Sequence, residues 1–417
     1  MPAKIFFVKS FANIKKELLL PQLRLNLNKK MKKISLSVAV IFIILTATKA
    51  QNSAEKIIAG NQGLHIGGYG QIDFNLPTRD GTIHKNGILD VHRLVTFFGY
   101  NFNEKASFVS EVEFEHVSEV YVEQAFLDYK IKDNLSVNAG LMLIPMGIQN
   151  LYHEPPTYNG VERTNVDKYI VPTTWREMGI GLSGRSIKNS LNYQVMVVNG
   201  FNGYDDGGKF SGKSGLRGGR QKGAKSYITF PDFTGRVSYY GQPGLNLGFS
   251  AYVGESESKA YDGLDLADET AVASADSTII GIQMLGVDAR YQKGALQIRG
   301  QYILANLANT EQYNAIGGKD LGSKMTGYYA ELGYNLLANF NTTNELIGFA
   351  RYENYNTHAE VAEGTSLNDA NNRTEITLGL GFKVAKGAMF KADYQILSNA
   401  SSEDKKGQFN FGTAIWF

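Results

Sequence analysis

GQFNFGTAIWF, residues 407–417, ends the sequence and is the stretch that indicates the fold. Every second position carries an apolar residue or threonine, the set being Phe409, Phe411, Thr413, Ile415 and Phe417. A period of two predicts a β-strand with one apolar face. A terminal strand of this kind favours a β-barrel, because pairing with the first strand removes an exposed sheet edge. The last strand of a soluble β-sandwich is the alternative.

The composition favours a barrel in a membrane. The 417 residues include 45 Gly, 23 Tyr and 23 Phe but only 9 Pro. Transmembrane barrels carry aromatic girdles at both membrane interfaces, so this composition suits them. The sequence has no cysteine, which excludes disulfides, thiol nucleophiles and thiolate metal sites.

The formal net charge of +2 is set by the first 50 residues, which hold ten Lys or Arg and one acidic residue. The remaining chain has 32 basic and 39 acidic residues, a net charge of −7. Nothing in this balance suggests nucleic-acid binding.

The N-terminal region reads as a targeting segment. Lys32 and Lys33 precede an apolar run over residues 34–45, and a cleavage site before Gln51 completes a signal peptide over residues 31–50. The run is shorter than the roughly 20 residues of a spanning helix. An uncleaved N-terminal anchor is the alternative. We expect residues 1–30 to be an upstream extension, with translation starting at Met31, and residues 51–64 to be a periplasmic lead.

From residue 65 to 417, apolar and polar residues alternate in segments of the length expected for the strands of a barrel. The predicted strands are sixteen, give or take two: 65–75, 89–102, 106–115, 119–131, 135–143, 176–185, 190–199, 233–240, 245–254, 279–292, 295–304, 325–337, 345–355, 373–384, 389–396 and 407–417. Connections alternate short and long, with one exception near residues 116–118. Short periplasmic turns and long external loops are typical of an all-β, antiparallel, transmembrane barrel.

Alternation also predicts which charges face the interior. In a membrane barrel the apolar face meets lipid and the polar face surrounds the lumen. We therefore predict these pore-lining residues: Arg93, Glu111, Glu113, Glu115, Arg236, Asp288, Arg290, Arg299, Glu331, Arg351, Glu353, Lys391 and Asp393. The alternative is that these charges are merely hydrated and form ion pairs across the barrel wall, without acting on permeating solutes.

Several segments resemble a known family. They are GYGQIDF (68–74), residues 93–115, AFLDY (125–129) continuing to residues 139–147, WREMGI (175–180) and the terminal Phe417. Together they resemble the phosphate-selective porin O and P family. The resemblance implies a sixteen-stranded outer-membrane barrel of a Gram-negative bacterium, a homotrimer, and a third external loop folded inward as the constriction. That loop would be residues 144–175, with Glu154, Glu162, Arg163, Asp167 and Lys168 as its charges. In outer-membrane barrels a terminal aromatic residue is read by the insertion machinery, so Phe417 is expected to contact it.

These expectations combine into a porin for passive diffusion of small hydrophilic solutes or ions. The solutes could include anions such as phosphate. The predicted constriction carries charges of both signs, so the sequence leaves open whether the pore prefers anions or cations. A structural or adhesive barrel with a plugged lumen is the rival, with the long loops near residues 200–232 and 255–277 binding partners.

Other chemistry is not expected. The six histidines show no metal-ligand spacing, so neither a metal site nor a cofactor is predicted, and no motif indicates an enzyme. Glycines at 207–208 and 218–219 indicate a flexible basic loop rather than a phosphate cradle. An acidic loop is expected to be solvated, or else to bridge lipopolysaccharide through divalent ions; its residues are Asp262, Asp265, Asp268 and Glu269.

Overall fold

The structure is a computed structural model that describes residues 62–79 and 82–417. The upstream extension, the signal peptide and most of the N-terminal lead predicted above lie outside the described residues. None of the helices in the described part of the chain is both long and apolar enough to cross a membrane.

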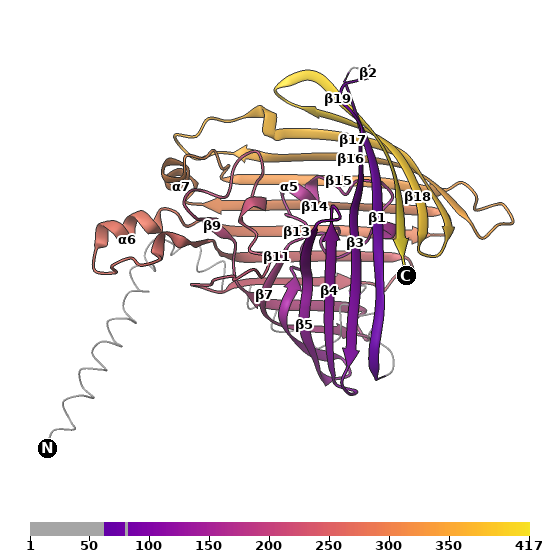
Figure 1. Cartoon of the computed structure of the whole chain (residues 1–417), viewed down its shortest axis with the longest axis horizontal. Coiled ribbons are helices and arrows are strands. Elements are labelled where there is room, and N and C mark those ends of the chain that lie inside the picture. Colours follow the sequence, from indigo (N-terminus) through magenta and orange to yellow (C-terminus); the bar gives the residue numbers. More distant parts are fainter. Residues whose placement is uncertain (1–61, 80–81) are drawn as a thin grey trace. The chain divides into compact units, whose positions relative to one another are not determined.

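One antiparallel sheet dominates the described residues (Figure 1). Its long strands are β1 (Gly63–Arg79), β3 (Ile88–Asn101), β4 (Ala106–Glu115), β5 (Glu119–Lys132), β6 (Leu135–Leu143), β7 (Arg176–Ser186), β8 (Leu191–Val198), β10 (Asp232–Tyr239), β11 (Leu245–Glu255), β13 (Gly281–Lys293), β14 (Leu296–Ala308), β15 (Lys324–Asn335), β16 (Glu345–Glu360), β17 (Asn372–Ala385), β18 (Ala388–Asn399) and β19 (Ser402–Trp416). A two-residue strand, β2 (Thr82–Ile83), extends the pairing of β1. Each long strand pairs with its neighbours along the chain, and β1 also pairs with β19, which closes a sixteen-stranded barrel as predicted.

The barrel closes where the C-terminal strand meets β1, as Figure 1 shows. Tyr69 is opposite Trp416 in the register, and the backbone N–H of Phe417 donates to the carbonyl of Gly68 at 2.9 Å. The Phe417 side chain is 65% exposed on the outside, whereas Trp416 packs against the buried interior cluster. A Cβ at Gly68 would lie 2.3 Å from the carbonyl oxygen of Val95, so only glycine fits this close approach.

The two faces of the sheet have the polarity of a membrane barrel. On β17 Leu378 is 54% exposed, while the adjacent Thr377 is 1% exposed. On β19 Phe411 is 50% exposed and Asn410 is 3% exposed. A soluble barrel would show the reverse, so the outward apolar face is the lipid face expected from the sequence.

Short segments of regular structure lie in the connections. The helices are α5 (Val166–Tyr169), α6 (Glu269–Asp276) and α7 (Thr310–Gly317), with short 3-10 turns η2 (Pro155–Thr157), η3 (Arg217–Gly219), η4 (Lys259–Tyr261) and η5 (Asp369–Asn371). Two short strands, β9 (Asn202–Tyr204) and β12 (Glu257–Ser258), pair in parallel and join two of the long loops.

Several predicted strand boundaries are wrong; β16 continues to Glu360 and β14 to Ala308, beyond the predicted ends at residues 355 and 304. The barrel begins at Gly63 rather than residue 65. The predicted loop over residues 397–406 is a turn at residues 400–401, because β18 continues to Asn399 and β19 already begins at Ser402. Residues 402–406 carry polar side chains on both faces, so no apolar alternation marks this end of β19.

Candidate pore and constriction

The long connection over residues 144–175, called here the constriction loop, folds into the barrel. Its apolar side chains are buried there, with Ile144, Met146, Val166 and Trp175 each 0% exposed. Of its charged residues only Lys168 is exposed. The inward-folded loop predicted from the sequence is therefore present.

Lys391 on β18 is the main polar anchor of the constriction loop. Its ammonium group donates to the carbonyl oxygens of Pro155, Tyr158 and Gly160 at 2.6, 2.7 and 2.8 Å. The same group lies 4.0 Å from the centroid of the Tyr158 ring. One buried cation thus uses all three of its donors on one stretch of loop backbone.

Carboxylates of the wall bind backbone donors of the same loop. Asp393 accepts from the N–H of Val161 at 2.6 Å, and Glu353 accepts from the N–H of Asn165 at 2.8 Å. In the opposite direction, Arg299 donates to the carbonyl of Thr157 at 2.8 Å. The loop backbone therefore satisfies its hydrogen bonds against charges of the barrel wall.

Among the charges predicted from the sequence, twelve are buried: Arg93, Glu111, Glu113, Arg236, Asp288, Glu331, Arg351, Glu353, Lys391, Asp393, Glu154 and Asp167. Five are half-buried: Glu115, Arg290, Arg299, Glu162 and Arg163. All thirteen strand residues lie away from the lipid face. Most of them hold the loop or one another instead of facing an open channel.

Ion pairs join many of these wall charges. Arg236 binds Asp288 through two parallel contacts of 2.6 and 2.7 Å. Arg351 Nε lies 2.8 Å from Glu353, and Arg93 lies 3.4 Å from Glu113. Pairing of this kind compensates charges taken out of water, and it explains how they are tolerated at 0–7% exposure.

A cavity of about 610 Å³ opens beside the constriction loop, towards the long external loops. Its lining includes nine Lys or Arg residues: Arg93, Arg163, Lys168, Arg176, Arg217, Arg220, Lys222, Arg373 and Lys406. The carboxylates in the lining are five: Glu113, Glu115, Glu162, Glu375 and Asp404. The accessible part of the interior is thus more basic than the wall as a whole, and we call it the basic vestibule.

Three of the vestibule cations come from the loop near residues 200–232, whose glycines at 207–208 and 218–219 predicted a flexible loop. That interpretation is wrong for this segment, because Phe210 and Leu216 are 0% exposed and anchor it over the interior. Arg220 donates to the carbonyls of Thr173 and Pro172 at 3.0 and 3.3 Å, and Arg217 donates to Thr173 as well. The side chains of these arginines are held by backbone carbonyl groups about 45 residues earlier in the sequence. A local sequence pattern cannot reveal contacts over such a distance.

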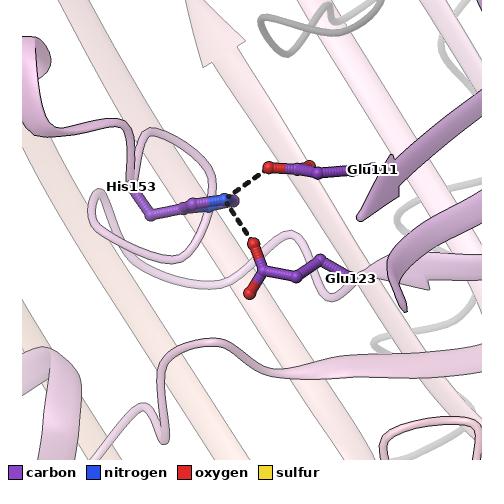
Figure 2. A group of neighbouring side chains, drawn as sticks. All are labelled: Glu111, Glu123 and His153. Carbon is purple, nitrogen blue, oxygen red and sulfur yellow. Dashed lines mark hydrogen bonds and ion pairs between the residues drawn. The ribbon is translucent and has the colours of Figure 1, made fainter. Parts of the chain in front are cut away.

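A second group of polar side chains lies deeper, where the constriction loop meets β4 and β5 (Figure 2). His153 Nε2 lies 3.4 Å from Glu111 Oε1 and 3.3 Å from Glu123 Oε2. Exposures of the three side chains are 2%, 1% and 0%. Burial lowers the pKa of His153, but the carboxylates of Glu123 and Glu111 outweigh it and raise the pKa to about 10.

Glu123 was missed by alternation because β5 carries an irregularity. The register with β4 shifts between Glu111, which faces Gln124, and Val112, which faces Val122. Glu123 is the extra residue, so both it and Gln124 are buried although they are adjacent. A β-bulge breaks the period of two, and this one turns an additional carboxylate towards His153.

Solved structures with this fold are outer-membrane channels. The outer membrane channel DcaP of Acinetobacter baumannii has a TM-score of 0.56 at 11% identity, over 86% of this chain and 99% of that chain. OmpF of Salmonella typhi, in complex with daunomycin, has a TM-score of 0.53 at 11% identity over 85% and 97%. An anion-selective porin from Comamonas acidovorans has 0.52 at 12% identity over 86% and 100%. At these identities the likeness establishes the porin fold.

Sequence comparison gives a relative of unknown role. No protein-family model matches the chain. An uncharacterized protein of Aquifex aeolicus is 30% identical over 372 residues, which cover 87% of this chain and 81% of that protein. The chain belongs to the same family as this Aquifex protein, a family whose member here has the barrel fold of outer-membrane porins.

Proposed function

We propose that the chain is an outer-membrane porin that lets small hydrophilic solutes diffuse passively, with a preference for anions. The barrel fold supports a channel, and the constriction loop provides the narrow region that selects solutes by size and charge. No step of chemistry is part of this proposal.

The basic vestibule is the observation that carries the anion preference. Nine cations and five carboxylates line it, so its formal balance is positive although the chain after residue 50 is acidic. A cavity lined mainly by one sign of charge concentrates ions of the opposite sign. Arginine also suits oxyanions, since its planar fork can bind phosphate or carboxylate through two donors. Phosphate, implied by the resemblance to the porin O and P family, therefore belongs to this proposal as one candidate solute.

The proposal includes export and assembly. Residues 31–50 would direct export, Phe417 would contact the barrel-insertion machinery, and the apolar outer face would meet lipid and lipopolysaccharide. The homotrimer implied by the sequence resemblance is tested by the mass of the detergent-solubilised protein.

Planar-bilayer recording tests the central claim. Purified protein should give stepwise conductance that rises with salt, and a potassium chloride gradient should give a reversal potential of the sign set by chloride permeation. A potential of the opposite sign would contradict the anion preference. Phosphate in place of chloride should still carry current, and its addition on one side should reduce chloride current if the two compete.

A plugged structural barrel is the second candidate, and burial of the interior favours it. Arg351 and Glu353 are 2% and 0% exposed, and the constriction loop covers them. A barrel closed in this way would be inserted and folded but would show no conductance steps in the same recordings.

A further inference from the structure

We propose that Glu111, Glu123 and His153 bind a divalent transition-metal ion, with Zn²⁺ as the first candidate, and that this ion fastens the constriction loop to the barrel wall. The two carboxylates come from β4 and from the bulge of β5, and the imidazole comes from the loop. None of the three residues lines the basic vestibule, but Arg176, which does, lies 3.6 Å from Glu123.

Geometry is the first argument. One ligand atom from each residue lies within 4.8 Å of the other two, and His153 Nε2 is 3.3 and 3.4 Å from the two carboxylate oxygens (Figure 2). These separations are long for N–H···O hydrogen bonds, which are most often about 2.9–3.0 Å. Zinc binds imidazole nitrogen and carboxylate oxygen at about 2.0–2.2 Å, so tetrahedral ligand atoms lie roughly 3.3–3.5 Å apart. Both distances from His153 Nε2 match this separation, and the distance between the two carboxylate oxygens is at most 4.8 Å.

The surroundings orient each ligand. His153 Nδ1 lies 3.2 Å from the carbonyl oxygen of Asn150, which favours the tautomer with a proton on Nδ1 and a free lone pair on Nε2. Gln124 donates to Glu111 Oε2 at 2.6 Å, and the Tyr69 hydroxyl donates to Glu123 Oε2 at 3.2 Å. Metal ligands commonly have such outer partners, because these fix the direction of the lone pairs.

Buried charge is an independent argument. Glu123 Oε1 is buried without a hydrogen-bond partner, and its cation neighbour, Arg176 Nη1, lies 3.6 Å away. Two buried carboxylates that face each other need positive charge to be stable. A proton on His153 supplies one charge and a divalent ion supplies two, so proton and metal compete for the same nitrogen.

The donor set narrows the choice of metal. One imidazole with two carboxylates suits Zn²⁺, Mn²⁺ or Co²⁺, whereas Mg²⁺ and Ca²⁺ prefer oxygen ligands alone. Three protein ligands leave a further position for water, as in zinc sites that are not fully closed by protein.

Metal content of the intact protein tests the proposal. Tag-free mature protein is purified from the outer membranes of cells grown with added Zn²⁺, so that the ion can enter during folding, and metal is measured per chain. We expect about one Zn²⁺ per chain, and at least tenfold less in His153→Gln and in Glu123→Gln. His358→Gln is the matched control, since His358 is as deeply buried, at 1% exposure, but lies on β16 in another part of the barrel; it should keep the parental metal content.

A second measurement does not depend on any variant. Parent protein refolded in Co²⁺ should show the visible absorption bands of a bound cobalt ion, and added Zn²⁺ should remove them. Both measurements are made at neutral and mildly alkaline pH because a proton competes for Nε2. Heat-modifiable gel mobility selects folded protein in every case. Folded parent without stoichiometric metal at either pH, or variants with parental metal content, would overturn the proposal and leave a protonated His153 ion pair as the link.

Discussion

Two long loops at the same end of the barrel differ in position: one lies inside the barrel and the other is largely exposed. The constriction loop over residues 144–175 lies inside the barrel, and residues 256–280 form a second loop that carries α6. In the first, Trp175 is 0% exposed; in the second, Leu266 is 56% exposed and α6 is capped at its start by Asp268, which accepts from the N–H groups of Thr270 and Ala271. Both loops contain charged and apolar residues, so composition alone does not separate them.

The difference lies in what the barrel wall offers. Apolar residues of the constriction loop recur along its whole length, and the wall provides donors and acceptors such as Lys391 and Asp393 for its backbone. The second loop satisfies its central turn locally, through its own helix and cap. A loop can therefore enter the lumen only where charges on distant strands replace the water that its backbone loses.

Removing the main anchor should have the largest effect. Lys391→Ala leaves the carbonyls of Pro155, Tyr158 and Gly160 without their donor. Each buried group left unsatisfied costs about 1–3 kcal/mol, so we expect a loss of about 3 kcal/mol or more in the free energy of unfolding. The loosened loop should also raise single-channel conductance. Urea unfolding followed by gel mobility, and bilayer recording, measure the two effects.

Lys383→Ala is the control for this anchor. Lys383 lies on the neighbouring strand, is 30% exposed, and pairs with Glu345 at 3.0 Å. An exposed ion pair contributes at most about 1 kcal/mol, so stability and conductance should stay near the parental values. Equal losses in the two variants would show that the loop does not depend on Lys391.

Charge reversal in the vestibule should have the next largest effect. Arg217→Glu combined with Arg220→Glu changes the formal charge of the lining by −4 and should move the reversal potential towards cation preference. The matched control is an exposed pair at the other end, Lys293→Glu at the last residue of β13 and Lys386→Glu in the turn between β17 and β18. If both pairs shift the potential equally, the effect comes from net charge and not from the vestibule.

A single charge reversal in the constriction loop should have a smaller effect on the reversal potential, because it changes the formal charge of the vestibule lining by only −2. Arg163→Glu or Lys168→Glu should shift the reversal potential in the same direction as the double variant but less far. The salt dependence of this shift helps to separate the two residues. Salt screens the exposed Lys168 more strongly than the half-buried Arg163, so the effect of Lys168→Glu should weaken more at high salt. Absence of any shift would place the selective region elsewhere in the pore.

How far the sequence could predict this molecule depends on the range of the interactions. Strand positions follow from alternation, since each side chain reports its own face; the barrel and the inward side of Arg93 or Glu353 were predicted in this way. Glu123 was missed because a bulge shifts the phase at one residue. Arg220 was missed because its partners are backbone carbonyls far along the chain. Alternation also cannot tell a residue that lines water from one that lies under a loop.

A pH change should have a modest effect through Lys222. Burial, with the nearby charges of Arg220 and Arg176, lowers the pKa of Lys222 below its ordinary 10.5. A lowered pKa means that Lys222 loses its charge at a lower pH than an exposed lysine does. Anion preference should therefore fall as the pH rises through the lowered pKa of Lys222, before an exposed lysine with a pKa of 10.5 would lose its charge. At a pH below the pKa of Lys222, this residue stays charged and the preference should not change. Lys222→Gln should remove this step from the pH profile of the reversal potential; an unchanged profile would assign the step to another group.

The smallest effect is expected from shortening the second loop. Replacing residues 263–274 with a short Gly-Ser linker removes the exposed turn and most of α6 but keeps Ala275, which is buried, and the contacts of Asn309 with the carbonyls of Ser277 and Ile279. Because these residues contribute neither to the vestibule nor to the anchors of the constriction loop, conductance, reversal potential and unfolding should remain parental. A marked rise in conductance would mean that this loop also restricts the pore, and that local satisfaction of its backbone does not keep it out of the permeation path.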